Sequence, residues 1–210
     1  MTRVLLIDSA ATGQESTSRR LTAEMVEQLR ARDPNLEIVR RDIGADPIPH
    51  LTEETVFAIR GAEPTTDAER AAIALSDALI EEIRSADVLV IGAPMYNFGM
   101  PSTLKAWFDH VLRARITFRY TEAGSEGLMT GKRAIVVESR AGFYSEGPGT
   151  ATDHQEPHIR TLLGFMGITD VTFVRAEKLA FGPDAAAASI AGASAELEQL
   201  ALAAETKLAA

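Results

Sequence analysis

Five hydroxyl side chains gather in the segment that follows the first apolar run of the chain: Ser9, Thr12, Ser16, Thr17 and Ser18. The last three are consecutive and directly precede a segment with helical spacing. Backbone N–H groups at a helix N-terminus, together with hydroxyl groups, can hold a phosphate monoester without any lysine. An ordinary helix N-cap needs only one such residue. The segment therefore predicts a phosphate site, with capping by one serine and solvation of the others as the alternative.

Two later segments carry groups that suit a flat heteroaromatic ligand. Residues 92–102 read GAPMYNFGMPS, and residues 138–145 read ESRAGFYS. Main-chain groups of such loops can hydrogen-bond the edges of a ring, while aromatic and apolar side chains contact its face. A phosphate site, an aromatic platform and a polar clamp together predict a nucleotide with a large planar ring.

Short apolar runs rich in valine and isoleucine must position these segments. They occur at residues 4–7, 88–91, 134–137 and 171–174, with a weaker one at 36–39, and they predict strands. Helical spacing predicts helices within or over residues 21–29, 73–83, 102–113, 157–166 and 184–208. This alternation predicts the α/β class: a doubly wound five-stranded parallel sheet in a three-layer α/β/α arrangement, forming a single domain over residues 1–210. Ligands of such sheets bind beyond the carboxyl ends of the strands, where the three segments lie.

Three stretches interrupt the alternation. Residues 42–53 carry a glycine and two prolines and predict a surface connection, and residues 116–131 predict a small hairpin. Residues 141–157 form a Gly/Pro-rich loop that is too long for a plain connection.

Composition excludes several classes of protein. The 210 residues include no cysteine, which excludes a disulfide scaffold, a thiolate metal site and a cysteine nucleophile. The net charge of −9, without a run of Lys or Arg, argues against nucleic-acid binding. Only four strongly apolar residues precede Asp8, which is too few for a signal peptide or a membrane span. We therefore expect a cytoplasmic protein with no nucleic-acid or membrane partner.

Other chemistries find little support. His154 and His158 suggest a metal pair, but Pro157 favours a helix that begins there and leaves His154 outside it. His110 lies on a predicted helix and is expected to be a partly exposed structural histidine. The chain has no Walker A motif, no G-x-G-x-x-G motif and no G-x-S-x-G elbow. We expect no metal and no catalytic role for His110.

Five motifs carry a resemblance to a known family. They read APMYNF (93–98), PSTLKAWFD (101–109), TFRY (117–120), GKRA (131–134) and LGFMGI (163–168). These motifs resemble the FMN-dependent NADH-azoreductase / NADH:quinone oxidoreductase family, over residues 3 to about 183. The resemblance implies a flavodoxin-like fold, a homodimer and non-covalently bound FMN.

The resemblance also implies which residues contact FMN. Those at the phosphate are Ser16, Thr17 and Ser18, with Ser9 as the candidate to replace a serine that the family usually has at Ala10. Those along the isoalloxazine and ribityl chain are Met95, Tyr96, Asn97 and Phe98. Those on the far side are Ser139, Arg140, Ala141 and Gly142. Thr17 stands where the family often has glutamine, and Ala141 where it often has glycine.

Two aromatic residues match positions that border the substrate face in the family. They are Tyr120 and Phe165, one of which is expected to come from the other subunit. We expect them to select flat acceptors by stacking. Leu162, Phe165 and Met166 also fit one helix stripe, so a core position for Phe165 is the alternative.

The implied reaction is a two-electron, ping-pong transfer. NADH or NADPH delivers a hydride to the flavin, and a quinone or azo compound then takes two electrons at the same place. The alternatives are a flavodoxin-type electron carrier and a flavin-free protein that senses NAD(P)H or serves as an interaction protein. Electron carriers of this type are shorter, so the extra stretches at 116–131 and 141–157 favour the enzyme.

Overall fold

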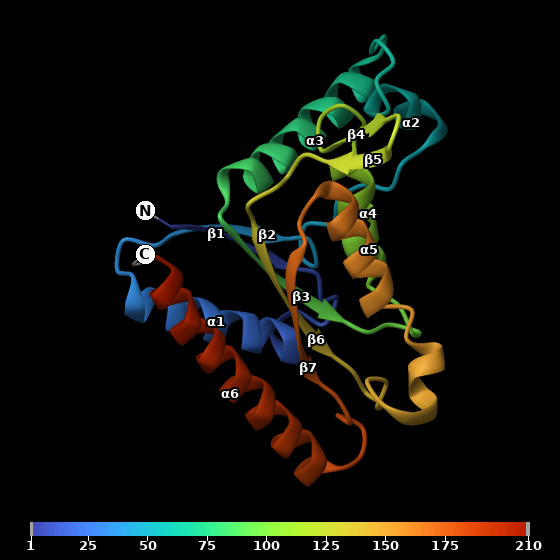
Figure 1. The fold of residues 1–210 in the computed structure, drawn as a ribbon. Coiled ribbons are helices and arrows are strands. Elements are labelled where there is room, and N and C mark those ends of the chain that lie inside the picture. Colours follow the sequence, from blue (N-terminus) through green and yellow to red (C-terminus); the bar gives the residue numbers. More distant parts are fainter. Residues whose placement is uncertain (1, 209–210) are drawn as a thin grey trace.

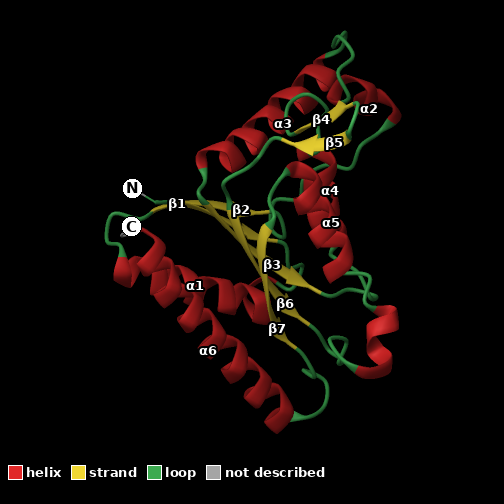
Figure 2. Ribbon diagram, viewed as in Figure 1, coloured by secondary structure: helices red, strands yellow, loops and turns green. Residues whose placement is uncertain are grey.

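A five-stranded parallel sheet forms the centre of the computed structural model, which describes residues 2–208 (Figures 1 and 2). Its strands are β1 (Arg3–Asp8), β2 (Glu37–Asp42), β3 (Val88–Pro94), β6 (Arg133–Ser139) and β7 (Asp170–Ala176). They lie in the order β2-β1-β3-β6-β7, and every neighbouring pair is parallel. The predicted doubly wound five-stranded sheet is confirmed. The predicted span 1–210 includes Met1 and residues 209–210, which lie outside the described residues.

Helices cover both faces of the sheet, as the three-layer prediction requires (Figure 2). Helices α1 (Thr17–Arg32) and α6 (Pro183–Leu208) lie on one face. The other face carries α3 (Asp67–Ser85), α4 (Ser102–Val111) and α5 (Glu156–Met166), and α2 (Glu53–Ile59) packs on α3. Successive strand residues point to opposite faces, so Val4 packs with α1 residues while Leu5 joins the core beneath α3 and α4. Both halves of the core are therefore built from nearly continuous apolar strands.

Local signals fix the helix ends. Ser16 is the N-cap of α1, and Pro157 lies in the first turn of α5, so His154 precedes that helix as predicted. The helix predicted over residues 102–113 ends at Val111, because the N–H of Arg113 is donated to the Thr117 hydroxyl instead. The short helix α2 was not predicted. It buries only Ala58 and Ile59, which is too little for a periodic pattern.

The predicted hairpin is present as β4 (Phe118–Thr121) and β5 (Gly124–Gly127), which pair antiparallel. It is fastened to the end of α5, where the N–H of Met129 donates to the carbonyl of Met166 at 2.7 Å. A Cβ at Gly127 would lie 2.1 Å from the nitrogen of Gly167. The hairpin can therefore reach α5 only because residue 127 has no side chain.

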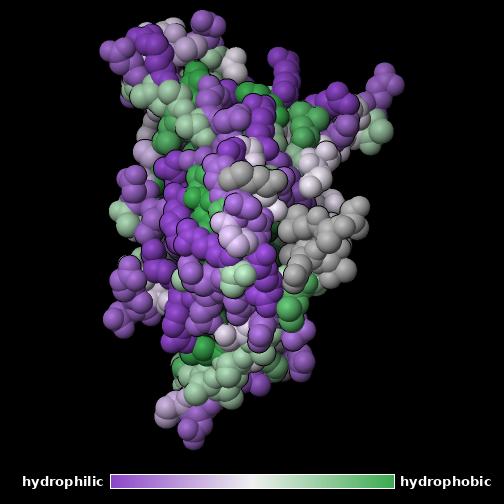
Figure 3. Space-filling model, turned by 90° about the vertical axis from the view of Figure 1, so that its left-hand side faces the viewer, coloured by the Kyte–Doolittle hydropathy of each residue, from purple (hydrophilic) through white to green (hydrophobic). Residues whose placement is uncertain are grey.

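Hydrophilic residues dominate the face drawn in Figure 3, with smaller apolar areas between them. Over residues 2–208, no helix combines the length and the hydropathy that a membrane crossing requires.

Candidate cofactor site

The N-terminus of α1 brings two of the predicted phosphate residues together. The Ser16 hydroxyl accepts a hydrogen bond from the N–H of Arg19 at 3.3 Å and lies 3.1 Å from the Ser18 hydroxyl. Both side chains are buried, and Thr17 is partly buried between them. A helix N-terminus carries partial positive charge and free N–H groups. Paired hydroxyls at this position fit a phosphate group.

Ser9 is placed differently. Its hydroxyl donates to the carbonyl of Gly92 at 2.6 Å, and the residue is 1% exposed. Its own carbonyl accepts the hydroxyl of Thr103 at 2.9 Å. Ser9 thus joins the end of β1 to β3 through its side chain and to α4 through its backbone carbonyl, and the hydroxyl hydrogen of Ser9 is already donated within the protein.

An ionic cluster that sequence reasoning missed supports this loop. The Arg19 guanidinium makes two hydrogen bonds to Asp42, at 2.6 and 2.7 Å, and lies 3.6 Å from Asp8. Asp8 also accepts the hydroxyl of Thr22, yet burial raises the pKa of this carboxyl. Arg19 lowers the pKa of Asp42. The cluster depends on the register that sets Asp8 beside Asp42 across β1 and β2, which no local pattern reveals.

The segment after β3 forms a tight turn. Tyr96 and Gly99 exchange two backbone hydrogen bonds, at 3.0 and 3.1 Å. Between them, Asn97 and Phe98 have φ angles of 48° and 70°, which are uncommon for residues with a side chain. The Tyr96 hydroxyl accepts the N–H of Ala11 at 3.1 Å, so this turn is held against the hydroxyl-rich segment.

Two contacts join this turn to the segment after β6. The N–H of Met95 donates to the carbonyl of Ser139 at 2.9 Å. The rings of Phe98 and Tyr144 meet edge to face, with centroids 6.2 Å apart. The three predicted segments therefore lie together at the carboxyl edge of the sheet.

The segment after β6 offers unpaired backbone donors. The carbonyls of Arg140, Ala141 and Gly142 accept the N–H groups of Leu179, Ala180 and Lys178, respectively, at 3.2, 3.0 and 2.7 Å. Among the residues that the structure describes, the N–H groups of Ala141 and Gly142 have no protein acceptor. Such donors fit the polar edge of a ring system.

The Arg140 side chain lies inside the protein. Its guanidinium is fully buried and contacts four partners from three segments: Glu138 at 2.6 Å, Gln155 at 3.1 Å, Glu177 at 3.2 Å and Asp153 at 3.1 Å. Its N–H and carbonyl also bond within the protein. Arg140 lies in a predicted site segment, but its guanidinium pairs with carboxylates inside the protein.

Tyr120 and Phe165 are joined by a third aromatic residue. The Phe118 ring lies 4.5 Å from Phe165 and 5.6 Å from Tyr120, centroid to centroid. Tyr120 is 74% exposed, whereas Phe165 is partly buried. Ile159, Leu163 and Met166 provide the buried stripe of α5, so Phe165 stands beside the core rather than within it.

Comparison with known proteins decides the family. Residues 2–201 match the family described as flavodoxin-like fold. A Hyphomonas neptunium protein named FMN-dependent NADH:quinone oxidoreductase is 52% identical over 201 residues, which cover 96% of either chain. The chain belongs to the FMN-dependent NADH:quinone oxidoreductase family.

Other members of the family agree in sequence and in structure. An Azotobacter vinelandii protein of the same name is 50% identical over 202 residues, 96% of this chain and all of the other. An FMN-dependent NADH-azoreductase from Bacillus anthracis, whose crystal structure contains FMN, superposes with a TM-score of 0.88 at 26% identity. That match covers 98% of this chain and 100% of the azoreductase. The flavodoxin-like fold is thus confirmed.

Two further residues differ from what the sequence predicts: the exposure of His110 was misjudged, and Glu177 was not identified. His110 was expected to be partly exposed, but it is 2% exposed, and its Nε2 lies 2.9 Å from the carbonyl of Pro49. Burial lowers the pKa of His110, which favours the neutral ring. Glu177 was missed, although it follows the last strand and the rule for carboxyl ends should have drawn attention to it.

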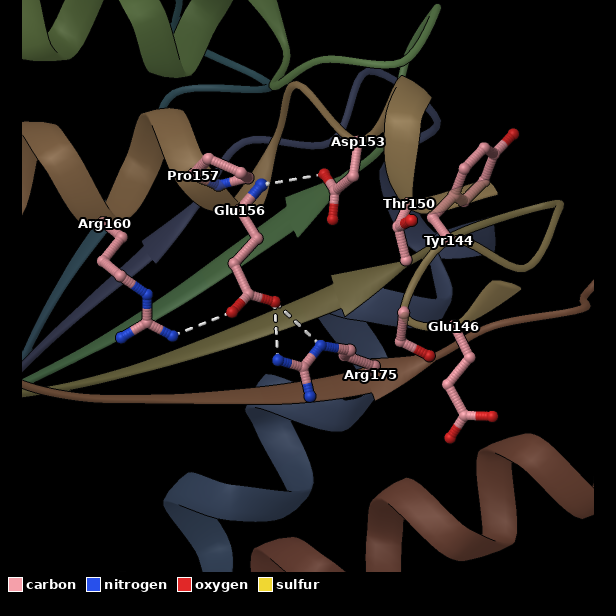
Figure 4. A pocket seen from close by; sticks show the side chains of 9 residues that line it. Tyr144, Glu146, Thr150, Asp153, Glu156, Pro157, Arg160 and Arg175 are labelled. Atoms are coloured by element: carbon pink, nitrogen blue, oxygen red, sulfur yellow. Dashed lines mark hydrogen bonds and ion pairs between the residues drawn. The ribbon is translucent and has the colours of Figure 1, made fainter. Parts of the chain in front are cut away.

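An open pocket lies beside the end of the segment after β6, and Tyr144 and Ser145 of that segment help to line it (Figure 4). It is lined by Tyr144, Ser145, Glu146, Thr150, Asp153, Glu156, Pro157, Arg160 and Arg175. The Glu156 carboxylate bonds to both arginines, as the dashed lines in Figure 4 mark. Over residues 2–208, no group of three or more His, Asp or Glu residues is arranged to hold a metal.

Glu138 makes the stability of this protein depend on pH. The residue is fully buried, and its Oε1 has no hydrogen-bond partner among the described residues. Burial raises its pKa to about 8, although Arg140 opposes this shift. A carboxyl whose pKa is higher in the folded state stabilises the fold below its unfolded pKa near 4.5. That contribution is lost as pH rises toward about 8.

We expect the free energy of unfolding to fall from pH 6 to pH 8.5 by up to about 3 kcal/mol. A Glu138→Gln variant, which stays neutral, should show a much flatter profile in urea titrations over the same range. Asp42 and Glu156 do not obscure this result, because the pKa of each is lowered and their contributions are lost only in acid. Parallel profiles for the two proteins would contradict the assignment.

Proposed function

We propose that this protein is an FMN-dependent NADH:quinone oxidoreductase that reduces quinones and azo compounds by two-electron, ping-pong transfer. The observation that carries the proposal is the meeting of three segments at the carboxyl edge of the sheet. They offer the paired hydroxyls of Ser16 and Ser18, the turn at 95–98 and the unpaired N–H groups of Ala141 and Gly142. The names of the relatives and the FMN in the azoreductase crystal structure support the same reading.

Each segment has a distinct task in this proposal. Ser16, Thr17 and Ser18 hold the phosphate at the N-terminus of α1, where the helix favours negative charge. Met95, Tyr96, Asn97 and Phe98 line the ring and its ribityl chain. The N–H groups of Ala141 and Gly142 stabilise negative charge that develops at the polar ring edge.

FMN, when bound here, would supply two-electron redox chemistry between a nicotinamide donor, NADH or NADPH, and the acceptor. The chain itself orients donor and acceptor in turn at one open ring face. Tyr120 and Phe165 favour flat acceptors by stacking. No side chain is assigned as an acid or a base.

We further propose a homodimer that works in the cytoplasm, where its nicotinamide donor is found. The 74% exposure of Tyr120 supports the dimer, because a second copy that covers the hairpin would shield this ring. Analytical ultracentrifugation tests it, and a monomer at micromolar concentration would refute it.

An absorbance experiment tests the proposed function. The purified protein is mixed with FMN, desalted and titrated with NADH without oxygen, and benzoquinone is then added. Retained yellow colour that NADH bleaches and the quinone restores is expected. Retained flavin that NADH fails to bleach would favour an electron carrier, and a protein that retains no flavin would refute the cofactor site. Repetition with NADPH reports the donor preference.

A further inference from the structure

Glu177, just after β7, gathers four hydrogen bonds on one carboxylate. Its Oε1 accepts the N–H groups of Tyr144 at 2.9 Å and Ser145 at 3.1 Å, and the Nη1 of Arg140 at 3.2 Å. Its Oε2 accepts the hydroxyl of Ser145. Glu177 is 6% exposed, so water competes little for these bonds. Hydrogen bonds to a carboxylate are stronger than those between neutral groups.

These bonds connect Glu177 to a loop that lies far from it in the sequence. Tyr144 and Ser145 lie 33 and 32 residues before Glu177 along the chain. Within the described residues, their N–H groups have no other acceptor. The Tyr144 ring in turn meets Phe98 of the turn after β3. The carboxylate therefore sets where residues 142–145 lie.

Arg140 extends the anchor to the neighbouring strand. Its Nε donates to the Oε1 of Gln155 at 3.1 Å, and the Nε2 of Gln155 donates to the carbonyl of Ala93 at 2.8 Å. Ala93 lies two residues before Met95. A continuous buried network thus connects the segment after β3, the segment after β6 and Glu177.

We propose that Glu177 is a positioning residue for the flavin ring, acting through the loop that it anchors. It holds residues 142–145, and with them the unpaired N–H groups of Ala141 and Gly142, against the turn at 95–98. Arg140 is its buried counter-charge. The inference rests on the proposed function, since the ring in question belongs to FMN. Glu177 itself contacts neither ring nor phosphate in this scheme.

Amide hydrogen exchange of the flavin-free protein tests the anchor directly. In a Glu177→Gln variant, the amides of Tyr144 and Ser145 lose a charged acceptor and should exchange at least about tenfold faster. The matched control is Glu156→Gln, because Glu156 carries a carboxylate that bonds to Arg160 and Arg175 but accepts no N–H from residues 139–145. Its exchange pattern at residues 144 and 145 should match that of the wild type.

The loaded protein provides the second readout. We expect Glu177→Gln to weaken FMN binding by about ten- to a hundredfold, and to shift the visible absorption maximum and the midpoint potential of the bound flavin. Glu156→Gln should change the dissociation constant less than about twofold. A purely structural role of Glu177 would lower the melting temperature and leave the potential and the spectrum of the folded protein unchanged, and that result would overturn the inference.

A milder variant covers the case in which Glu177→Gln does not fold. Ser145→Ala removes only one hydrogen bond at a surface residue and should weaken FMN binding by about two- to fivefold. Wild-type affinity and spectrum in this variant would overturn the inference. Wild-type protein that fails to retain FMN, with amide exchange that still depends on Glu177, would refute the proposed function and leave the anchor established.

Discussion

A Ser18→Asp variant is expected to lose FMN. Ser18 is the second residue of α1, and its hydroxyl lies beside that of Ser16. A carboxylate in the first turn of a helix is favourable by about 0.3–1 kcal/mol, which offsets part of the cost of burying it at Ser18, a residue that is 0% exposed. A phosphate group bound nearby would be repelled by this carboxylate. Two unit charges about 5 Å apart repel by about 3 kcal/mol at an effective dielectric constant of about 20. The expected loss of FMN affinity exceeds about a hundredfold.

Thr66→Asp is the control for this variant. Thr66 is the N-cap of α3, on the opposite face of the sheet from α1, and its hydroxyl accepts the N–H of Glu69 at 3.1 Å. Aspartate keeps this cap and adds the same charge away from the three segments. Fluorescence titration with FMN and circular dichroism should report wild-type binding for Thr66→Asp and a folded, flavin-free Ser18→Asp. Tight FMN binding by Ser18→Asp would place the phosphate elsewhere.

The second large effect is expected at the hairpin. A Cβ at residue 127 would lie 2.1 Å from the nitrogen of Gly167 and 2.3 Å from the carbonyl carbon of Met166. Both are backbone atoms, which cannot turn aside as a flexible side chain would. Gly127→Val must therefore push the hairpin away from α5. Overpacking of this kind costs about 1–3 kcal/mol, which corresponds to a fall in melting temperature of about 3–10 °C.

The same displacement should separate acceptor binding from flavin binding. The hairpin carries Phe118 and Tyr120, and its movement breaks the ring contact between Phe118 and Phe165. None of the three segments proposed to contact FMN belongs to the hairpin. We therefore expect Gly127→Val to raise the KM for a quinone several-fold and to leave the dissociation constant of FMN nearly unchanged. An unchanged KM would remove Tyr120 from the proposed acceptor site.

Gly164→Ala separates the steric effect from the loss of a glycine. Gly164 lies within α5, and a Cβ there meets no heavy atom within 4 Å. Alanine in a helix is more favourable than glycine by up to about 1 kcal/mol, so this variant should melt at a slightly higher temperature. Loss of stability in both Gly127→Val and Gly164→Ala would show that these glycines act in some other way than by allowing close approach.

Local pattern accounts for much of what could be predicted. The valine- and isoleucine-rich runs predict strands because a parallel sheet buries both faces of each strand. The hydroxyl run before residue 19 predicts a helix start, and Ser16 is that cap. The carboxyl-end rule then brings three loops to one edge without any knowledge of their contacts. Each of these inferences needs only neighbouring residues and the period of the strand or helix.

Contacts between distant segments decided the directions of the polar side chains and the burial of His110. The directions of the Ser9 hydroxyl and the Arg140 guanidinium depend on which groups the folded chain sets beside them, namely the Gly92 carbonyl and the acids that surround Arg140. The burial of His110 depends on the carbonyl of Pro49, 61 residues earlier. The sequence by itself thus determined the strands, most of the helices and the edge of the sheet at which the three segments meet, because short-range periodicity and capping encode them. Only the tertiary structure decided which polar groups stay unpaired at that edge and which, like Arg140 and Glu177, bond to one another, because hydrogen-bond partners in this fold come from strands and loops far apart in the chain.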